Sequence, residues 1–218
     1  MPKAPASGRA PGRSVAQAQY RQRAPHYDAE LLVFEPVRAH AIALLGLRPG
    51  EQVLDVGCGT GLSFDGLRSR VGPRGRITGI EQCPEMLARA EARVAACHWG
   101  NVELVEAAAS EAEFQGLADA ALFHFTHDIL RHEPSLDNVL AHLKPGARVV
   151  AVGLQWAPPW AWAANGFVMA AAMYSVSRLD GLVRPWELLA ARLEDVEVES
   201  TGFGAIFLLR GLHAPRAH

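Results

Sequence analysis

The nine residues Val53-Leu54-Asp55-Val56-Gly57-Cys58-Gly59-Thr60-Gly61 decide the fold of this chain. A short apolar strand runs directly into a loop with three glycines, and residues 62–70 then follow a helical pattern. Because glycine has no side chain, such a loop lets a ligand lie against the backbone, and the helix start behind it offers free N–H groups to an anion. The glycines are spaced G-x-G-x-G, whereas the dinucleotide pattern G-x-G-x-x-G would place its third glycine at Leu62. The loop therefore predicts a ligand site in an α/β protein, with a ligand other than NAD.

This stretch resembles motif I of the class I S-adenosylmethionine (SAM) dependent methyltransferases, which commonly reads V-L-D-x-G-x-G-x-G. The resemblance implies SAM as the cofactor and S-adenosylhomocysteine as the product derived from it. It also implies that the cofactor lies against Asp55, Gly57, Cys58, Gly59, Thr60 and Gly61. The alternative interpretation is an ordinary strand-to-helix turn, in which Cys58 is only a small side chain that faces the core.

Glu81 stands twenty residues after Gly61, at the end of a second predicted strand over residues 76–80. An acidic residue at this distance from a glycine loop commonly accepts hydrogen bonds from the hydroxyls of a ribose. The alternative is a solvated glutamate at a strand end. The spacing favours the ribose contact, and we expect Glu81 to bind the cofactor.

The family resemblance departs from the common pattern at the adenine end of the cofactor. Many members have an aspartate after the third strand, and its carboxylate accepts from the adenine amino group. This chain has Ala108 near that place. Adenine recognition is then expected from backbone groups around Ala109, from Ser110 or Glu111, and from Gln82 packing beside the ring.

Strands and helices alternate along most of the chain. Strands are predicted at 52–56, 76–80, 102–106, 119–125 and 147–152, with a turn at 144–146, and helices are predicted near 36–45, 62–70, 84–97 and 185–192. In the helix after Pro84, the helical spacing predicts one buried face with Leu87, Ala90, Val94 and Cys97. This alternation predicts a parallel sheet with helices on both faces.

The C-terminal pattern is different. Residues 196–199 alternate, Thr201-Gly202 forms a turn, and residues 205–210 are apolar, which predicts two antiparallel strands. The methyltransferase fold has this layout, so the resemblance covers about residues 27–211. The expected fold is a single-domain, Rossmann-like α/β fold with a mostly parallel seven-stranded sheet and a C-terminal antiparallel hairpin.

Length, composition and charge limit the classes of protein to which this chain can belong. The chain has 218 residues, 50% of them apolar and 20% charged, as expected for one soluble globular domain. Residues 1–26 form a basic tail with five Lys or Arg side chains and no acid, so the remainder is more acidic than the net charge of −2. An acidic body is a poor partner for nucleic acid. The three cysteines and the missing signal peptide predict a cytoplasmic protein, and we expect a monomer or homodimer.

An apolar insertion at about residues 156–178 does not belong to the minimal fold. Its start, Trp156-Ala157-Pro158-Pro159-Trp160, follows the fifth strand, where open α/β sheets bind ligands. We expect a lid with Trp156 and Trp160 at the acceptor, although an ordinary core helix is the alternative. Tyr27 resembles the tyrosine of the entry helix in small-molecule and quinone methyltransferases, which implies acceptor binding. The alternative interpretation is that Tyr27 only packs against the sheet.

Four candidates for acid–base chemistry follow the fourth strand: His124, His127, Asp128 and His132. A histidine titrates near neutral pH, and a neighbouring carboxylate can orient it, so we expect His127, assisted by Asp128 or His124, to be the proton acceptor. The alternative interpretation is that His124 only lines the cofactor site with its backbone and that His132 is a solvated loop residue. The spacing matches no zinc pattern, and we expect no metal.

The sequence therefore predicts a SAM-dependent methyltransferase that acts on an oxygen or nitrogen atom of a small, apolar or aromatic metabolite. One alternative is a membrane-surface enzyme for a lipid headgroup or quinone, because the Trp-rich insertion and the basic tail both favour an anionic interface. Another is a SAM-binding sensor or partner subunit without turnover.

Overall fold

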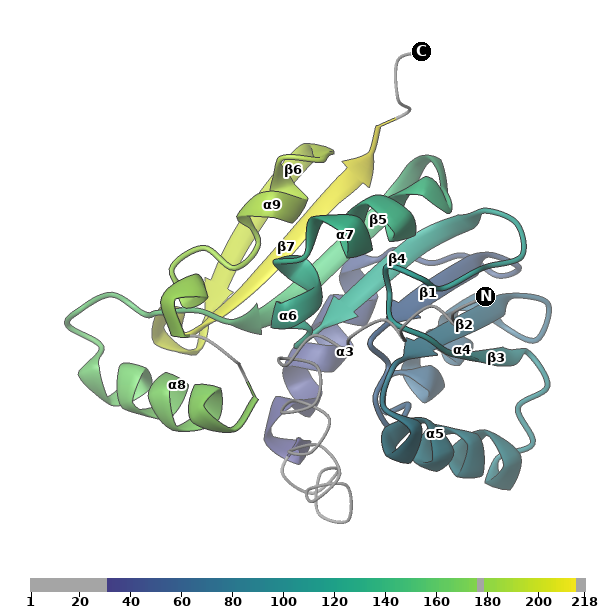
Figure 1. Ribbon diagram of the computed structural model, residues 1–218, viewed down its shortest axis with the longest axis horizontal. Helices are drawn as coiled ribbons and strands as arrows, with labels where there is room; N and C mark the ends of the chain where they lie inside the picture. Colours follow the sequence, from purple (N-terminus) through teal and green to yellow (C-terminus); the bar gives the residue numbers. More distant parts are fainter. Residues whose placement is uncertain (1–30, 176–178, 215–218) are drawn as a thin grey trace, which may run out of the picture.

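The computed structural model describes residues 31–175 and 179–214, which form one seven-stranded sheet in the order β3-β2-β1-β4-β5-β7-β6 (Figure 1). The first five strands pair in parallel, whereas β7 lies antiparallel between β5 and β6. The strands are β1 (Gln52–Val56), β2 (Arg76–Glu81), β3 (Val102–Glu106), β4 (Ala118–His124), β5 (Leu143–Leu154), β6 (Leu193–Thr201) and β7 (Ile206–His213). This is the predicted mixed sheet with its terminal hairpin, and the expected fold class is confirmed.

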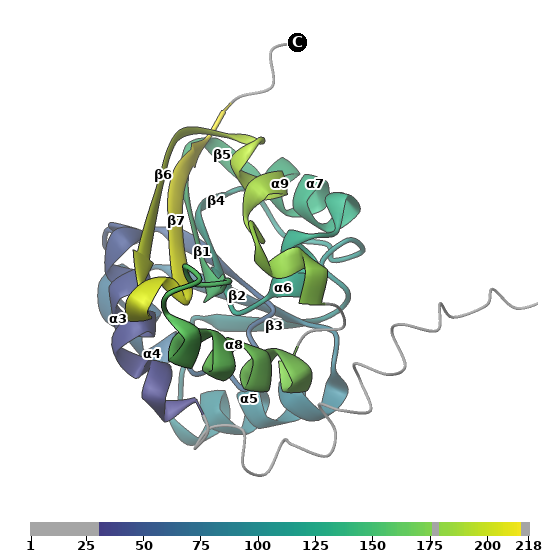
Figure 2. The same ribbon diagram turned by 90° about the vertical axis from the view of Figure 1, so that its left-hand side faces the viewer.

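Helices cover both faces of the sheet. In Figure 2, α3 and α4 lie on one face, and α6, α7 and α9 lie on the other. The helices are α3 (Glu35–Leu44), α4 (Phe64–Val71), α5 (Pro84–Ala96), α6 (His127–Leu130), α7 (Glu133–Ala141), α8 (Trp162–Ser175) and α9 (Glu187–Ala190), with short 3-10 turns η1 (Leu32–Phe34), η2 (Leu179–Leu182) and η3 (Gly202–Gly204). Pro36 and Pro84 stand in the first turns of α3 and α5, where a missing N–H costs nothing.

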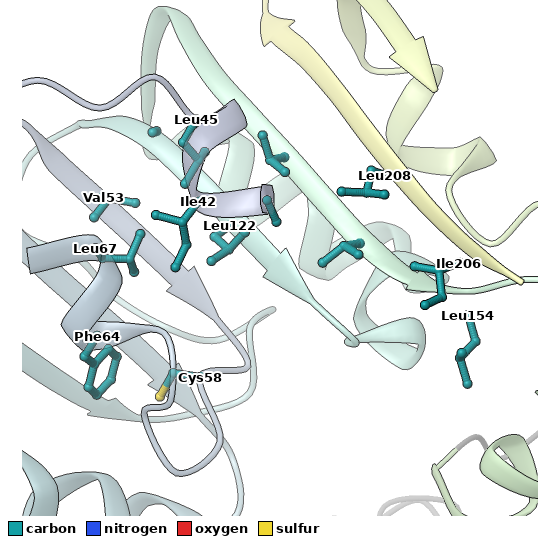
Figure 3. Close-up of a cluster of buried hydrophobic side chains, with 14 of the residues drawn as sticks. Ile42, Leu45, Val53, Cys58, Phe64, Leu67, Leu122, Leu154, Ile206 and Leu208 are labelled. Carbon is teal, nitrogen blue, oxygen red and sulfur yellow. The ribbon is translucent and has the colours of Figure 1, made fainter. Parts of the chain in front are cut away.

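Two hydrophobic cores hold these layers together. The first joins α3, α4 and α5 to one face of the sheet, and Figure 3 shows Ile42, Phe64 and Leu122 among its side chains. The second lies on the opposite face, where Leu136 of α7 and Leu189 of α9 pack on the sheet. Strands β1 and β4 contribute to both cores and are therefore fixed from both sides.

Two local predictions are wrong. Residues 144–146, expected to form a turn before the strand, lie inside β5. The pairing of β5 with β4 is irregular there, because Leu143 pairs with Ala118 but the next pair is Arg148 with Ala120. Cys97 was expected on the buried face of this helix, but it is exposed and follows the last residue of α5, Ala96. Met86, near the start of the helix, is buried in addition to Leu87 and Ala90. Tyr27 and the basic tail 1–26 lie outside the described residues.

The insertion after β5 forms α8. Figures 1 and 2 both place α8 at the end of the sheet toward which β4 and β5 run. Among residues 31–175 and 179–214, no helix is long and apolar enough to cross a membrane.

Candidate functional site

The glycine loop joins the carboxyl end of β1 to α4. Gly57, Gly59 and Gly61 all have positive φ, at 72°, 57° and 77°, a region that other residues rarely adopt. The N–H of Cys58 donates to the carbonyl of Ile80 at 2.9 Å, which ties the loop to β2. The loop therefore has a fixed backbone conformation, and it lies at the carboxyl ends of the parallel strands.

Close packing leaves no space for side chains in this loop. A Cβ at Gly57 would come within 2.5 Å of the Thr126 Cγ2, and a Cβ at Gly61 would overlap the ring of Phe64. The Cys58 side chain faces the first core (Figure 3), so only its backbone remains for a ligand. Thr60 is buried, and its carbonyl accepts from Arg93 Nε at 3.0 Å.

Glu81 ends β2 directly beside this loop. Its Oε2 accepts from the N–H of Gly59 at 3.1 Å and its Oε1 accepts from the N–H of Cys83 at 2.8 Å. Burial raises the pKa of Glu81, and these backbone donors partly oppose that shift. Each carboxylate oxygen keeps a second lone pair, so Glu81 can accept a further hydrogen bond from a ligand hydroxyl.

Asp55 lies at the base of the site, fully buried on β1, and its Oδ2 has no hydrogen-bond partner. Burial raises the pKa of Asp55 to about 7, while the Arg38 guanidinium opposes this shift and the Glu81 carboxylate adds to it. Arg38 reaches the site from α3, is itself buried, and pairs with Glu35. A buried carboxylate oxygen without a hydrogen bond is costly, and it identifies a place where a polar or cationic ligand group would be stabilised.

The histidines after β4 have separate surroundings. His127 is buried, and its Nε2 lies 2.9 Å from the carbonyl of Leu154, to which it donates. Burial lowers the pKa of His127, although the carbonyls and Asp128 oppose that shift. The Nε2 of His124 is buried without a partner, and burial lowers the pKa of His124 to about 3. His132 is exposed and hydrogen-bonds to Ser135 at 2.8 Å.

An aromatic cluster adjoins these histidines. Phe125 has a positive φ of 57°, and its ring centroid lies 4.9 Å from that of His124 and 4.7 Å from that of Phe34. The Phe34 ring in turn lies 6.0 Å from Phe167 of α8. A residue held in this strained conformation needs support from its neighbours, and such residues concentrate at functional sites. We call Phe34, His124, Phe125 and Phe167 the aromatic cluster.

The loop after β3 is fastened from the opposite layer. Asn138 of α7 donates from Nδ2 to the carbonyls of Ala109 and Ala112, both at 2.9 Å. Ala109 is buried, whereas Gln82 at the end of β2 is exposed. The adenine contact expected at Ala109 therefore depends on a loop that one asparagine holds in place.

Replacing Asn138 by alanine is expected to weaken SAM binding several-fold and to lower the free energy of unfolding by about 1–2 kcal/mol, because two buried carbonyls lose their donor. Isothermal titration calorimetry and urea unfolding measure the two effects. Asn101→Ala is the matched control: Asn101 also donates to two carbonyls, those of Gly72 and Gly75, but at the other end of the sheet. An equal loss of SAM affinity in both variants would contradict the prediction.

The predicted acceptor residues of the insertion lie at different depths. Trp156 is half-buried against the first core, and its N–H donates to the carbonyl of Leu182 at 2.8 Å. Trp160 is exposed at the turn before α8. Asn165 closes this turn, accepting from the N–H of Ala157 and donating to its carbonyl. The structure thus brings Trp156, but not the side chain of Trp160, against the packed body of the protein.

Comparisons with known proteins agree with this geometry. Residues 53–146 match the family described as "Methyltransferase domain". The N-methyltransferase NodS from Bradyrhizobium japonicum WM9, solved with S-adenosylhomocysteine, has a TM-score of 0.67 at 17% identity over 92% of this chain and 99% of its own. Residues 53–146 are therefore a methyltransferase domain, and the chain has the fold of the SAM-dependent methyltransferases. SAM is the cofactor of such a domain.

Two curated relatives of this methyltransferase domain are quinone methyltransferases by name. The demethylmenaquinone methyltransferase of Bacillus cytotoxicus is 31% identical over 120 residues, which is 53% of this chain and 49% of the relative. The 2-phytyl-1,4-naphtoquinone methyltransferase of Synechocystis sp. is 29% identical over 152 residues, which is 64% of this chain and 62% of the relative. The matched part of the chain thus spans about half to three fifths of these relatives.

The residues present fit SAM. The orphaned Oδ2 of Asp55 suits an ammonium group, and the spare lone pairs of Glu81 suit a ribose. Among residues 31–175 and 179–214, no group of His, Cys, Asp and Glu could hold a metal ion.

Sequence reasoning missed three contributors to the site: Arg38, Asn138 and the phenylalanines of the aromatic cluster. A lone arginine among apolar residues of α3 was a usable signal for Arg38. No sequence signal pointed to Asn138, because the two residues whose carbonyls it contacts lie 29 and 26 residues earlier in the chain.

Proposed function

We propose that this chain transfers the methyl group of SAM to an oxygen or nitrogen atom of a small aromatic acceptor, with reduced quinones as the first class to test. The observation that carries this proposal is the aromatic cluster, which stands beside the glycine loop at the end of β4. Flat rings with centroids 4.7–4.9 Å apart offer stacking and edge contacts to another flat ring. The names of the two quinone methyltransferase relatives support the same acceptor class.

In this proposal, the glycine loop, Asp55 and Glu81 bind the cofactor, which supplies a methyl group already activated on a sulfonium. The chain itself then has to hold the acceptor in line and keep water away. Phe34 and Phe125 orient the acceptor ring, and Phe167 and Trp156 bring the insertion over it. A hydroxyl acceptor must also lose a proton, and the free Nε2 of His124 is the acceptor atom that we assign to it.

Release of S-adenosylhomocysteine tests the proposed function. The purified full chain is incubated with SAM and a panel of short-chain hydroquinones, catechols and aromatic amines, and the products are identified by mass spectrometry and NMR. We expect turnover with an aromatic member of the panel. SAM binding without turnover on any of them would instead support the sensor or partner subunit, and turnover only on aliphatic acceptors would contradict the role of the aromatic cluster.

The pH dependence of SAM binding provides a second test. Because the pKa of Asp55 is about 7, a cationic ligand group beside it favours the ionised carboxylate, and binding releases a proton. Affinity is therefore expected to rise by about tenfold between about pH 6 and pH 8. Titration calorimetry in buffers of different ionisation enthalpy measures both quantities.

Asp55→Asn is the control for this pH dependence, since the amide cannot titrate. Without SAM, the folded state holds the Asp55 proton more tightly than the unfolded state does, so the wild-type protein loses stability as the pH rises from about 4 to about 7, and the loss levels off above that. The Asp55→Asn variant should show a flatter melting temperature across this range. A SAM affinity that rises equally in both proteins would assign the titration to another group.

A further inference from the structure

Large apolar side chains are exposed at the end of the sheet where the parallel strands finish. Trp160 is 71% exposed, Trp162 at the start of α8 is 80% exposed, and Phe203 in η3 is 78% exposed. Leu32 and Val33 of η1 and Val183 after η2 are also exposed. We call these six residues the apolar rim. Single exposed apolar residues need no explanation, but a group of this kind marks an interaction surface.

The segments that carry the apolar rim meet around α8. Pro158 packs against Gly204, so the turn with Trp160 lies beside the η3 residue Phe203. The N–H of Trp156 donates to the carbonyl of Leu182, which fixes Val183 near the same turn. The contact of Phe34 with Phe167 brings η1 to α8. Figures 1 and 2 agree that α8 and the N-terminal end of α3 lie at this end of the molecule.

The sequence that carries Trp160 and Trp162 is uncharged, and charged residues flank the apolar rim. The sequence between Arg148 and Arg178 contains no charged side chain. Arg184 follows Val183, is exposed, lies 5.6 Å over the Trp186 ring, and forms an exposed ion pair with Glu187 at 3.6 Å. In sequence, residues 1–26 carry Lys3, Arg9, Arg13, Arg21 and Arg23 and no acid, and Asp28 and Glu30 follow before Leu32. Glu35, the acid nearest to η1 in the chain, is paired with Arg38.

We propose that the apolar rim docks on the surface of a lipid bilayer that contains anionic lipids. Tryptophan and phenylalanine insert at the level of the headgroups, and Lys and Arg beside them are attracted to anionic lipid. This inference rests on the proposed function for its purpose: the rim borders the aromatic cluster, so an acceptor with an apolar tail reaches the site directly from the bilayer. Docking itself requires neither SAM nor acceptor.

Vesicle flotation tests the proposal on the full chain. Phosphatidylcholine vesicles with and without phosphatidylglycerol are the probes. We expect binding to the vesicles that contain phosphatidylglycerol, weakened by salt because part of the attraction is electrostatic. Replacing Trp160 and Trp162 together by serine should lower the partition coefficient on the order of tenfold or more, since both lose apolar surface for insertion.

Two further variants separate docking from folding. Phe203 has a positive φ of 59°, so Phe203→Gly relieves the backbone while removing the ring, and it should fold normally yet bind vesicles less tightly. Leu117→Ser is the matched control, because Leu117 is 44% exposed before β4, at the opposite end of the sheet. It should bind vesicles like the wild type.

Three outcomes would overturn the proposal. They are unchanged vesicle binding in the double tryptophan variant, an equal loss in Leu117→Ser, or absence of vesicle binding with a dimer in solution that the tryptophan variant dissociates. The last outcome would assign the apolar rim to a second copy of the chain. Turnover on a soluble short-chain hydroquinone is measured without vesicles, so failure of docking and failure of the proposed function are distinguishable.

Discussion

Replacing His124 by alanine is expected to lower turnover roughly 10²–10⁴-fold, the usual contribution of a positioned proton acceptor. His124 is the stronger candidate because its Nε2 is free, whereas the Nε2 of His127 already donates to the carbonyl of Leu154. SAM affinity measured by calorimetry should change little. Since burial lowers the pKa of His124 to about 3, the ring stays neutral at every ordinary assay pH, but it is a weak base, which places the expected loss at the lower end of this range.

A pH profile therefore distinguishes the two histidines. If His124 accepts the proton, kcat should show no acid limb with a midpoint between about pH 6 and 7, the ordinary range of a histidine. His127→Gln is the matched variant, because a glutamine amide can still donate to the carbonyl of Leu154. We expect it to keep near-normal turnover. Loss of turnover in His127→Gln with normal turnover in His124→Ala would return the role to His127, the first choice from the sequence.

Replacing Glu81 by alanine is expected to weaken SAM binding by on the order of 1–3 kcal/mol, or about 5- to 150-fold in Kd. The structure argues for the upper part of this range. Glu81 holds the backbone N–H groups of Gly59 and Cys83 in addition to its proposed contact with the ribose, so alanine would remove that ligand contact and also loosen the glycine loop.

Glu106→Ala is the matched control for this measurement. Glu106 ends β3 directly beside Glu81 in the register and is exposed, so it tests whether the loss reflects only negative charge at this edge. Calorimetry with SAM and with S-adenosylhomocysteine should show near wild-type affinity for Glu106→Ala. Wild-type affinity in Glu81→Ala would remove the ribose site from this residue. NAD is expected to bind none of the three proteins.

The sequence predicted the backbone elements of the site well, because these elements are specified by short, local stretches of sequence. The run from Val53 to Gly61 carries a strand, a tight loop and a helix start in nine consecutive residues, and the position of Glu81 follows from one further helix and strand. The terminal hairpin was also readable, since alternation over 196–199 and an apolar run over 205–210 are short-range signals. These predictions needed no knowledge of which side chains meet across the fold.

The sequence did not predict how side chains meet across the fold. The bond between His127 and Leu154 joins residues 27 positions apart, and only the packing of α6 against β5 decides that this imidazole is engaged. Phe34 reaches Phe125 from a different layer of the molecule. Periodicity says which face of an element is buried, but not which partner a buried group finds, so the predicted order of the two histidines rested on residue type alone.

The position of β7 has a consequence for how this chain is made. The last strand of the chain lies inside the sheet, with β5 on one side and β6 on the other. A ribosome releases residues 206–213 after every other strand, so until then β6 has no neighbour and β5 presents an open edge. The nascent chain can assemble β1 to β5 while it is still tethered to the ribosome, but the sheet closes only after residues 206–213 have been made. A premature stop shortly before residue 206 would therefore yield a chain that pairs with other chains instead of folding.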